Sequence, residues 1–264
     1  MVYVPAGEFT MGSDAAGLAY AVALCRRFST DPATALATCQ RSAFTDEQPA
    51  HTVALDAFWL DRTEVTNGQY RRCEAAGGCT APAEEGSYTR PSYYIAPEFA
   101  GYPVVWVTWR QAAEYCAWAG ARLPTESQWE FAARGPDGRL FPWGNVFDGS
   151  RLNYCDSRCT AGPNDGSVDD GYADTAPVGS FPAGASWTGA LDLAGNVREW
   201  VSDWYGRYPA EPQNNPTGPA TGDSHIPRGG SWLDKPDDVR SANRGANDPD
   251  YTRHKVGFRC AWAP

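Results

Sequence analysis

The sequence lacks a hydrophobic run long enough to cross a membrane, and it lacks any cluster of basic residues. The longest apolar stretch, around 102–109, is far shorter than the roughly 20 residues that a membrane-spanning helix needs. There are 22 Lys and Arg against 32 Asp and Glu, which gives a net charge of −10. An acidic protein repels phosphate backbones, so we expect neither nucleic-acid binding nor direct membrane insertion.

Histidine is scarce, and no signal peptide is visible. His51, His225 and His254 are far apart and form no metal-binding motif. Met1 is followed at once by Val-Tyr-Val-Pro-Ala-Gly, which reads as a strand already inside the fold. We therefore expect that a leader or an upstream segment precedes this sequence in the intact protein.

The composition that is present indicates an ordered globular protein. Hydrophobic residues are 42% of the chain and charged residues 20%, which argues against disorder. The chain also holds 11 Trp, 27 Gly and 21 Pro. This mixture predicts irregular backbone fixed by aromatic side chains rather than long helices or a regular sandwich.

Eight cysteines, an even number, favour disulfides and an oxidising compartment, although a thermophilic cytoplasm would also permit them. Three pairs are close in sequence: Cys25 with Cys39, Cys73 with Cys79, and Cys155 with Cys159. The two that remain, Cys116 and Cys260, would then pair over a long range. Zinc is the alternative, because Cys-Asp-Ser-Arg-Cys at 155–159 could be half of a site, but no second compact Cys/His pair accompanies it. We expect disulfides and an extracytoplasmic or cell-surface location.

Threonine caps and glycine stops predict three helices. They are expected at 67–75, 110–118 and 126–134, after Thr66, Thr108 and Thr125. Strand-like runs occur at 2–5, 52–60, 104–107 and 256–262. Residues 136–192 are rich in Gly, Pro, Asp and Ser and read as long ordered loops, which need disulfides, buried Trp or bound cations to hold them.

Six motifs occur in order over nearly the whole chain. They are Val-Pro-Ala-Gly-Glu-Phe at 4–9 with Met-Gly at 11–12, Phe-Trp-Leu-Asp-Arg-Thr-Glu-Val-Thr-Asn at 58–67, Arg-Leu-Pro-Thr-Glu-Ser-Gln-Trp-Glu at 122–130 with Ala-Ala-Arg-Gly at 132–135, Asp-Leu-Ala-Gly-Asn-Val-Arg-Glu-Trp at 192–200, Arg-Gly-Gly-Ser-Trp at 228–232, and Gly-Phe-Arg-Cys at 257–260. With these motifs the chain resembles the formylglycine-generating-enzyme (sulfatase-modifying factor) family, apart from an insertion at about 14–45.

The resemblance implies an α+β, C-type-lectin-like fold with little regular secondary structure and long ordered loops, in a single domain over 1–264. It also implies a disulfide between Cys116 and Cys260. The insertion looks partly helical, and we expect Cys25 and Cys39 to clamp it.

Two structural calcium sites are implied by the same resemblance. The first would comprise Asn153, Tyr154, Asp170 and Tyr172, with the tyrosines giving backbone carbonyls. The second would comprise Asp192, Gly195, Val197 and Glu199, with Gly195 and Val197 giving carbonyls. Calcium prefers several mixed oxygen ligands from a loop that folds around it, although the acids alone could also cap turns and helices. Arg198 departs from the family, where relatives often have an aromatic residue.

The cysteines that the resemblance requires for catalysis are missing. In the enzyme, two cysteines after the Gly-Gly-Ser motif bind copper, which suits soft thiolates. Here residues 231–239 read Ser-Trp-Leu-Asp-Lys-Pro-Asp-Asp-Val, and after Cys159 the only cysteine is Cys260. The His-rich helical domain of an iron-dependent branch is also absent. We therefore expect no copper and no formylglycine formation.

The segment 228–260 alternates between framework-like and arbitrary positions. The arbitrary positions are Leu233, Asp234, Lys235, Asp237, Asp238, Gly245, Ala246, Asn247, Asp248, Tyr251, Thr252, His254 and Lys255. The pattern resembles the variable region of diversity-generating-retroelement proteins, in which template adenines are mutated. Randomised Asn codons cannot give Glu, Gln, Met, Trp or Lys, and the two lysines are a departure from that rule.

The sequence therefore predicts a non-catalytic protein that binds an unidentified protein or other macromolecular ligand through these thirteen positions. Among them Tyr251, which is aromatic and amphipathic, is expected to be the binding hot spot. Asp234, Asp237, Asp238 and Asp248 are expected to form an acidic surface. The alternatives are an accessory domain without diversification and a family enzyme of unknown oxidative chemistry. A concave site with convergent titratable groups would favour the enzyme, and a flat exposed surface would favour recognition. The sequence defines neither the ligand nor the oligomeric state.

Overall fold

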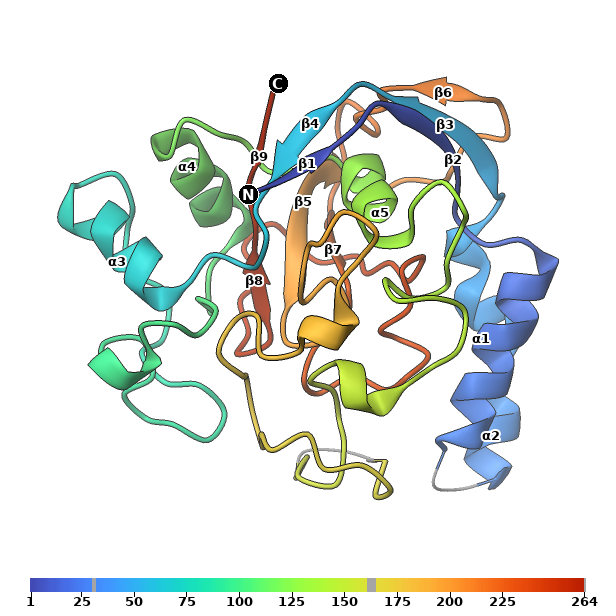
Figure 1. Ribbon diagram of the computed structural model, residues 1–264, viewed down its shortest axis with the longest axis horizontal. Coiled ribbons are helices and arrows are strands. Elements are labelled where there is room, and N and C mark those ends of the chain that lie inside the picture. The colour runs from blue at the N-terminus through green and yellow to red at the C-terminus, as the bar shows by residue number, and fades with distance from the viewer. Residues whose placement is uncertain (30–31, 161–164, 264) are drawn as a thin grey trace.

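The computed structural model describes residues 1–29, 32–160 and 165–263 (Figure 1). Within this part of the chain, nine short strands form three sheets. The sheets run β1 (Val2–Val4)–β4 (Phe58–Leu60)–β9 (Ala261–Trp262), β2 (Gly7–Met11)–β3 (His51–Leu55)–β6 (Gln213–Asn214), and β7 (His225–Arg228)–β5 (Arg198–Trp204)–β8 (Val256–Phe258). Because β1 and β9 share a sheet, the two ends of the chain lie close together at the top of Figure 1.

The helices begin where the threonine caps predict. Helices α3 (Asn67–Ala75), α4 (Trp109–Trp118) and α5 (Glu126–Arg134) each have a complete capping box, formed by a threonine hydroxyl and a glutamine at the third helical position. Every residue of α5 is buried, so this helix lies at the centre of the molecule. The remaining short 3-10 turns are η2 (Pro97–Phe99), η3 (Gly149–Arg151) and η4 (Pro182–Gly184).

Three expected strands differ from the prediction. The run 256–262 is divided into β8 and β9, which belong to different sheets. The run 52–60 is split into β3 and β4, which belong to different sheets. The run 104–107 forms no strand among the described residues, although Val104, Val105 and Val107 are buried. Trp106 has a φ of 62°, which is outside the extended region and interrupts the run. Hydrophobicity here therefore reports burial and not strand pairing.

The insertion is helical, as expected. It comprises α1 (Ala15–Arg27), α2 (Pro32–Thr38) and the 3-10 helix η1 (Arg41–Glu47). Cys25 of α1 is bonded to Cys39, and their neighbours Leu18, Ala35 and Phe44 form a separate small core. The insertion is thus a compact helical unit with its own apolar interior.

All four expected disulfides are present. They join Cys25 to Cys39, Cys73 to Cys79, Cys116 to Cys260 and Cys155 to Cys159. The zinc alternative is therefore wrong, because Cys155 and Cys159 are bonded to each other. The disulfides indicate an oxidising, extracytoplasmic environment. Among the described helices, none has the length and apolar character needed to span a bilayer.

The core contains ion pairs as well as apolar side chains. Arg259, fully buried, donates from Nε and Nη2 to the Glu199 carboxylate at 2.6 and 2.7 Å, and Trp129 of α5 donates to the same group at 2.8 Å. Arg259 also donates to the carbonyls of Asp61, Arg62 and Leu191. One buried charge pair therefore connects β5, α5 and two loops.

We expect Arg259→Met to reduce the free energy of unfolding by about 3–5 kcal/mol, because Glu199 would remain buried without its cation. Urea denaturation monitored by tryptophan fluorescence measures the loss. The matched control is Arg139→Met, which removes an exposed pair with Asp137 and should cost less than about 1 kcal/mol. Equal losses in the two variants would show that the Arg259 pair is not a central support.

Candidate ligand-binding site

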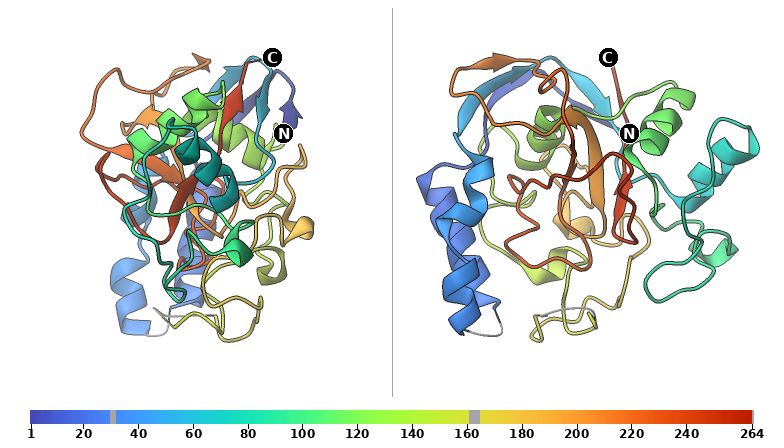
Figure 2. Two further views of the ribbon diagram at one scale, coloured as in Figure 1. Left: turned by 90° about the vertical axis from the view of Figure 1, so that its left-hand side faces the viewer. Right: turned by 180° about the vertical axis from the view of Figure 1, so that it is seen from behind.

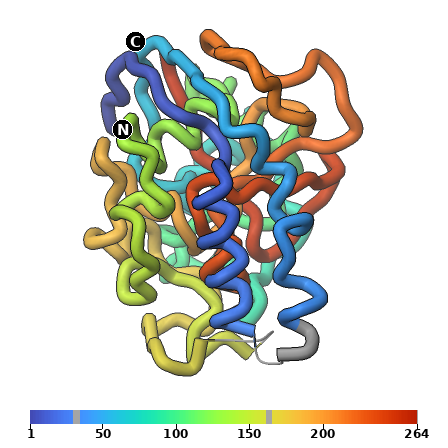
Figure 3. Tube along the Cα trace, turned by 90° about the vertical axis from the view of Figure 1, so that its right-hand side faces the viewer, coloured from blue at the N-terminus to red at the C-terminus, as the bar shows by residue number. Residues whose placement is uncertain are grey.

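The predicted variable segment is a long loop that joins β7 to β8 and is fixed at framework positions. The backbone N–H of Trp232 donates to Asn196, and that of Ser241 donates to Leu140. Trp232, Val239 and Arg240 are buried. Figures 2 and 3 place this loop, coloured red, beside α1 and the rest of the insertion. The loop is therefore held by its framework side chains against the scaffold and the insertion.

A cavity of about 400 Å³ lies between this loop and the insertion, and we call it the insertion cavity. The insertion side is formed by Cys25, Thr38, Ala43, Phe44 and Asp46. Six of the thirteen predicted positions line the other side: Asp237, Asp238, Gly245, Asn247, Tyr251 and Lys255. Arg198, Pro227, Asn243, Arg244 and Val256 complete the wall. The structure thus brings about half of the predicted ligand contacts into one concave site.

The insertion is attached to the loop by buried charges. Arg240 makes a bidentate ion pair with Glu47 of η1, in which its two Nη atoms lie 2.8 and 2.6 Å from the two carboxylate oxygens. Ser13 Oγ donates to the same carboxylate at 2.6 Å, and Arg244 donates to the carbonyl of Asp46. Although burial alone would raise it, the pKa of Glu47 is lowered by Arg240. The cavity therefore has two walls that are fixed to each other.

The expectation of an exposed acidic surface is wrong for Asp234 and Asp237, which are 8% and 5% exposed. Asp234 accepts hydrogen bonds from Arg198 Nε at 2.8 Å and Lys255 Nζ at 3.0 Å, and also from Ser231. Burial would raise its pKa, but Arg198 and Lys255 together lower it to about 2. Asp234 is buried because it neutralises Arg198, the residue that departs from the family pattern.

The other predicted positions lie outside the cavity. Ala246 and Asp248 are exposed, whereas Lys235 and Thr252 are partly exposed. Leu233 packs beside Trp232 and the Cys155–Cys159 disulfide. The His254 ring lies 5.4 Å from that of Trp232 and 5.2 Å from that of Tyr88. These residues form the rim and the neighbouring surface and do not face the cavity.

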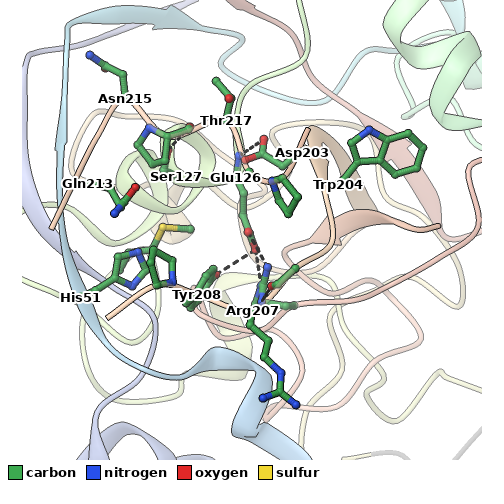
Figure 4. Close-up of a pocket in the computed structure, with 17 residues that line it drawn as sticks. His51, Glu126, Ser127, Asp203, Trp204, Arg207, Tyr208, Gln213, Asn215 and Thr217 are labelled. Carbon is green, nitrogen blue, oxygen red and sulfur yellow. Dashed lines mark hydrogen bonds and ion pairs between the residues drawn. The ribbon is translucent and has the colours of Figure 1, made fainter. Parts of the chain in front are cut away.

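A second cavity of about 410 Å³ meets the first at Arg244, which lines both (Figure 4). Glu126, the first residue of α5, accepts two hydrogen bonds from Arg244 at 2.6 and 2.9 Å and one from Tyr208 at 3.0 Å. Asp203 accepts from the backbone N–H of Glu126 at 2.9 Å. Burial and the charge of Glu126 raise the pKa of Asp203 to about 7. No motif drew attention to Asp203, because its partner is 77 residues away.

The first predicted calcium set fits the ion in one respect. Asn153 Oδ1 is buried and has no hydrogen-bond partner among the described residues, whereas its amide nitrogen donates to Asp174 and Asn196. Asp170 accepts from the backbone N–H groups of Tyr154 and Tyr172, and Asn153 directly precedes Tyr154 in the chain. Amide and carboxylate oxygens are the ligand types that calcium prefers.

The second set has fewer free oxygens. Both oxygens of Glu199 accept from Arg259, and one also accepts from Trp129. Asp192 accepts from the backbone of Gly179. The buried Glu64, which the sequence did not point to, has an Oε2 without a partner in the described part of the chain. The described residues contain no group of three or more His, Cys, Asp or Glu placed to hold a metal, so an ion here would depend on carbonyl and amide oxygens.

Comparison with known proteins identifies the family. Residues 1–264 match the family model described as the sulfatase-modifying factor enzyme 1-like domain. The chain belongs to this family. It is 32% identical to the formylglycine-generating enzyme of Bos taurus over 302 aligned residues, which cover 99% of this chain and 74% of that protein. The inactive C-alpha-formylglycine-generating enzyme 2 of Mus musculus is 40% identical over 165 residues, covering 60% and 48%.

The fold is also that of a solved variable protein. Treponema denticola variable protein 1 superimposes with a TM-score of 0.70, at 21% identity, over 100% of this chain and 95% of that one. At this identity the likeness shows the fold alone. It confirms the predicted α+β, C-type-lectin-like fold of the formylglycine-generating-enzyme type.

We expect Asp203→Asn to stabilise the protein more at pH 8 than at pH 5. The folded pKa of about 7 exceeds the ordinary value of 3.8, so the folded state binds the proton more tightly than the unfolded state. The contribution of Asp203 to stability is therefore fully present below about pH 4 and is lost as pH rises towards 7. Asparagine cannot ionise, so the variant does not lose this stability as the pH rises, and its advantage over the wild type is larger at pH 8.

Urea denaturation of the wild type and the variant at pH 5 and pH 8 measures the difference. The exposed Asp248→Asn variant is the matched control and should show no such pH dependence. A stabilisation by Asp203→Asn that is equal at both pH values would contradict the raised pKa.

Proposed function

We propose that this chain is a non-catalytic ligand-binding protein whose insertion cavity and rim carry diversified residues, as in the variable protein of a diversity-generating retroelement. The observation that carries the proposal is the gathering of six predicted variable positions at one cavity on a buried framework. Framework residues such as Trp232, Val239 and Arg240 are buried, whereas six predicted variable positions line one cavity. Side chains on a rigid scaffold can change without loss of the fold. We also place the protein at the cell surface.

The contacts narrow the set of positions that can vary freely. Asp234 and Lys255 form the ion-pair network with Arg198, so randomising them would leave buried charge unpaired. A Cβ at Gly245 would lie 2.8 Å from Pro227 Cγ, so larger residues there would require movement. The freest positions are Ala246 and Asp248, which are exposed, followed by Tyr251 and Thr252, which are partly exposed. The exposure of these four residues supports a role in recognition.

An enzyme of unknown oxidative chemistry is the second candidate, and one observation favours it. The insertion cavity is concave and contains convergent titratable groups, including Asp237, whose pKa burial and Asp238 raise to about 6. Against this, all eight cysteines are in disulfides, so no thiolate is available to bind copper or to attack a substrate.

Sequencing of the DNA that flanks the gene in several isolates tests the proposal. We expect a near-copy of codons 228–260 that differs from the gene only at its adenines, beside a reverse-transcriptase gene. Differences between isolates should concentrate at the rim positions and spare Asp234 and Gly245. Absence of both the repeat and the reverse transcriptase would overturn the retroelement assignment and leave an ordinary family member.

Calcium is proposed as a structural cofactor bound by Asn153 and Asp170 with the carbonyls of Tyr154 and Tyr172, and by Asp192 and Glu199 with the carbonyls of Gly195 and Val197. Its chemistry would be to neutralise buried carboxylates and fix the loops around them. We expect millimolar calcium to raise the melting temperature over EDTA by several degrees, with magnesium as the control. Asn153→Ala should remove part of the rise. An unchanged melting temperature with calcium would refute the assignment.

A further inference from the structure

We infer that the insertion cavity binds a positively charged side chain, lysine or arginine, from a protein ligand. This inference rests on the proposed binding function and names the chemistry of the group that enters the site. The volume of about 400 Å³ is in the range of pockets that take small molecules, so a side chain or a short segment can enter and a folded domain cannot.

Three carboxylates in the cavity wall have no salt-bridge partner. They are Asp46 of η1 and Asp237 and Asp238 of the C-terminal loop, and none forms an ion pair with any described residue. They come from both walls, so a group between the walls would meet carboxylates on two sides. Unpaired acids in a recess attract a cation, because a partly enclosed site screens charge less than open water does.

Each cation in the same wall already has a carboxylate partner behind it, although two of them share one. Arg198 and Lys255 share Asp234, at 2.8 and 3.0 Å, and Arg244 is paired with Glu126 at 2.6 Å. The lining itself holds three carboxylates and three cations, but among the described residues only the cations have salt-bridge partners, Asp234 and Glu126, the second of which also lies 3.5 Å from Arg228. An anionic ligand would have to displace buried ion pairs, whereas a cation would complete the set.

Asp237 supplies a second, independent indication. Its side chain is 5% exposed, and Oδ1 is buried without any hydrogen-bond partner in the described chain. A buried carboxylate oxygen without a donor costs free energy unless a ligand supplies one. Ammonium and guanidinium groups supply several N–H donors and a positive charge at once. The half-buried ring of Tyr251 adds an aromatic wall, and Arg253 already lies over this ring, 5.3 Å from its centroid, so a ligand cation would have to approach the ring from the cavity.

The test is a titration of the isotope-labelled protein with N-acetyl-arginine methylamide and N-acetyl-lysine methylamide, followed by amide NMR shifts. Neutral N-acetyl-glutamine methylamide and anionic N-acetyl-glutamate methylamide are the comparison probes. We expect the cationic probes to shift the amides of Gly245, Asn247 and Tyr251 and to bind at least tenfold more tightly than the other two. Equal binding of all four probes, or no binding by the cationic ones, would overturn the inference.

Two variants and a pH series locate the effect. Asp237→Asn and Asp46→Asn should each weaken binding of the arginine probe about tenfold or more, and the exposed Asp248→Asn, outside the cavity, should not. If Asp237→Asn fails to fold, the wild type at pH 5 and pH 7.5 answers the question. Protonation of Asp237 should weaken binding at pH 5, because it removes one of the negative charges that a cation would meet. The titratable and charged groups around Asp237 are Asp46, Asp238, Arg198, Arg244 and Lys255 in the cavity lining, with Lys235 and Arg240 nearby. An affinity for the arginine probe that is the same at pH 5 and pH 7.5 would contradict the inference that Asp237 binds a cation.

The probe titration and the DNA sequencing test different claims, so either can fail without the other. Failure of the cationic probes with a template repeat present would remove the ligand class and leave the proposed function. Binding of the arginine probe without any template repeat would leave a cation-binding cavity on a protein that is not diversified.

Discussion

Buried ion pairs between arginines of the C-terminal segment and glutamates elsewhere hold this molecule together. Arg228, Arg240, Arg244 and Arg259 point inward and pair with Glu130, Glu47, Glu126 and Glu199, respectively. The sheets have only short strands, so backbone ladders alone cannot fix the long loops. A guanidinium has five donors and can bind a carboxylate and several carbonyls at once, which suits a chain with much irregular backbone.

These pairs also explain why the loop between β7 and β8 can carry a binding site. Arg240 and Arg244 anchor the loop from within, and Arg228 and Arg259 fix the chain at its two ends, so that Asn247, Asp248 and Tyr251 are left to face the insertion cavity or solvent. Arg240 has a further role because its partner, Glu47, belongs to the insertion. The insertion is therefore fixed to the loop that it faces, and the insertion cavity is a property of both segments.

The sequence was most informative where the determinants are local. Thr66, Thr108 and Thr125 marked helix starts because a cap involves residues three positions apart, and the paired cysteines could be matched by proximity. The sequence was uninformative where the partner is distant. Strand β5 was missed because its charged residues are neutralised by partners 36 to 60 residues away, such as Asp234 for Arg198 and Arg259 for Glu199. The acidic surface was predicted for the same reason, since Asp234 looks exposed until Arg198 is placed beside it.

The residues that follow the Gly-Gly-Ser motif form an internal ion-pair network. Copper prefers soft thiolate ligands, whereas Asp234 is a hard carboxylate. The oxygens of Asp234 already accept hydrogen bonds from Arg198, Lys255 and Ser231. Substituting cysteine for Asp234 alone would leave Arg198 buried without its counter-charge, which is destabilising. Arg198 and Asp234 are thus interdependent, because each supplies the counter-charge of the other in a buried position. The segment after Gly-Gly-Ser is held by this internal salt bridge, and the neighbouring insertion cavity is lined by Arg198 and Lys255 of the same network.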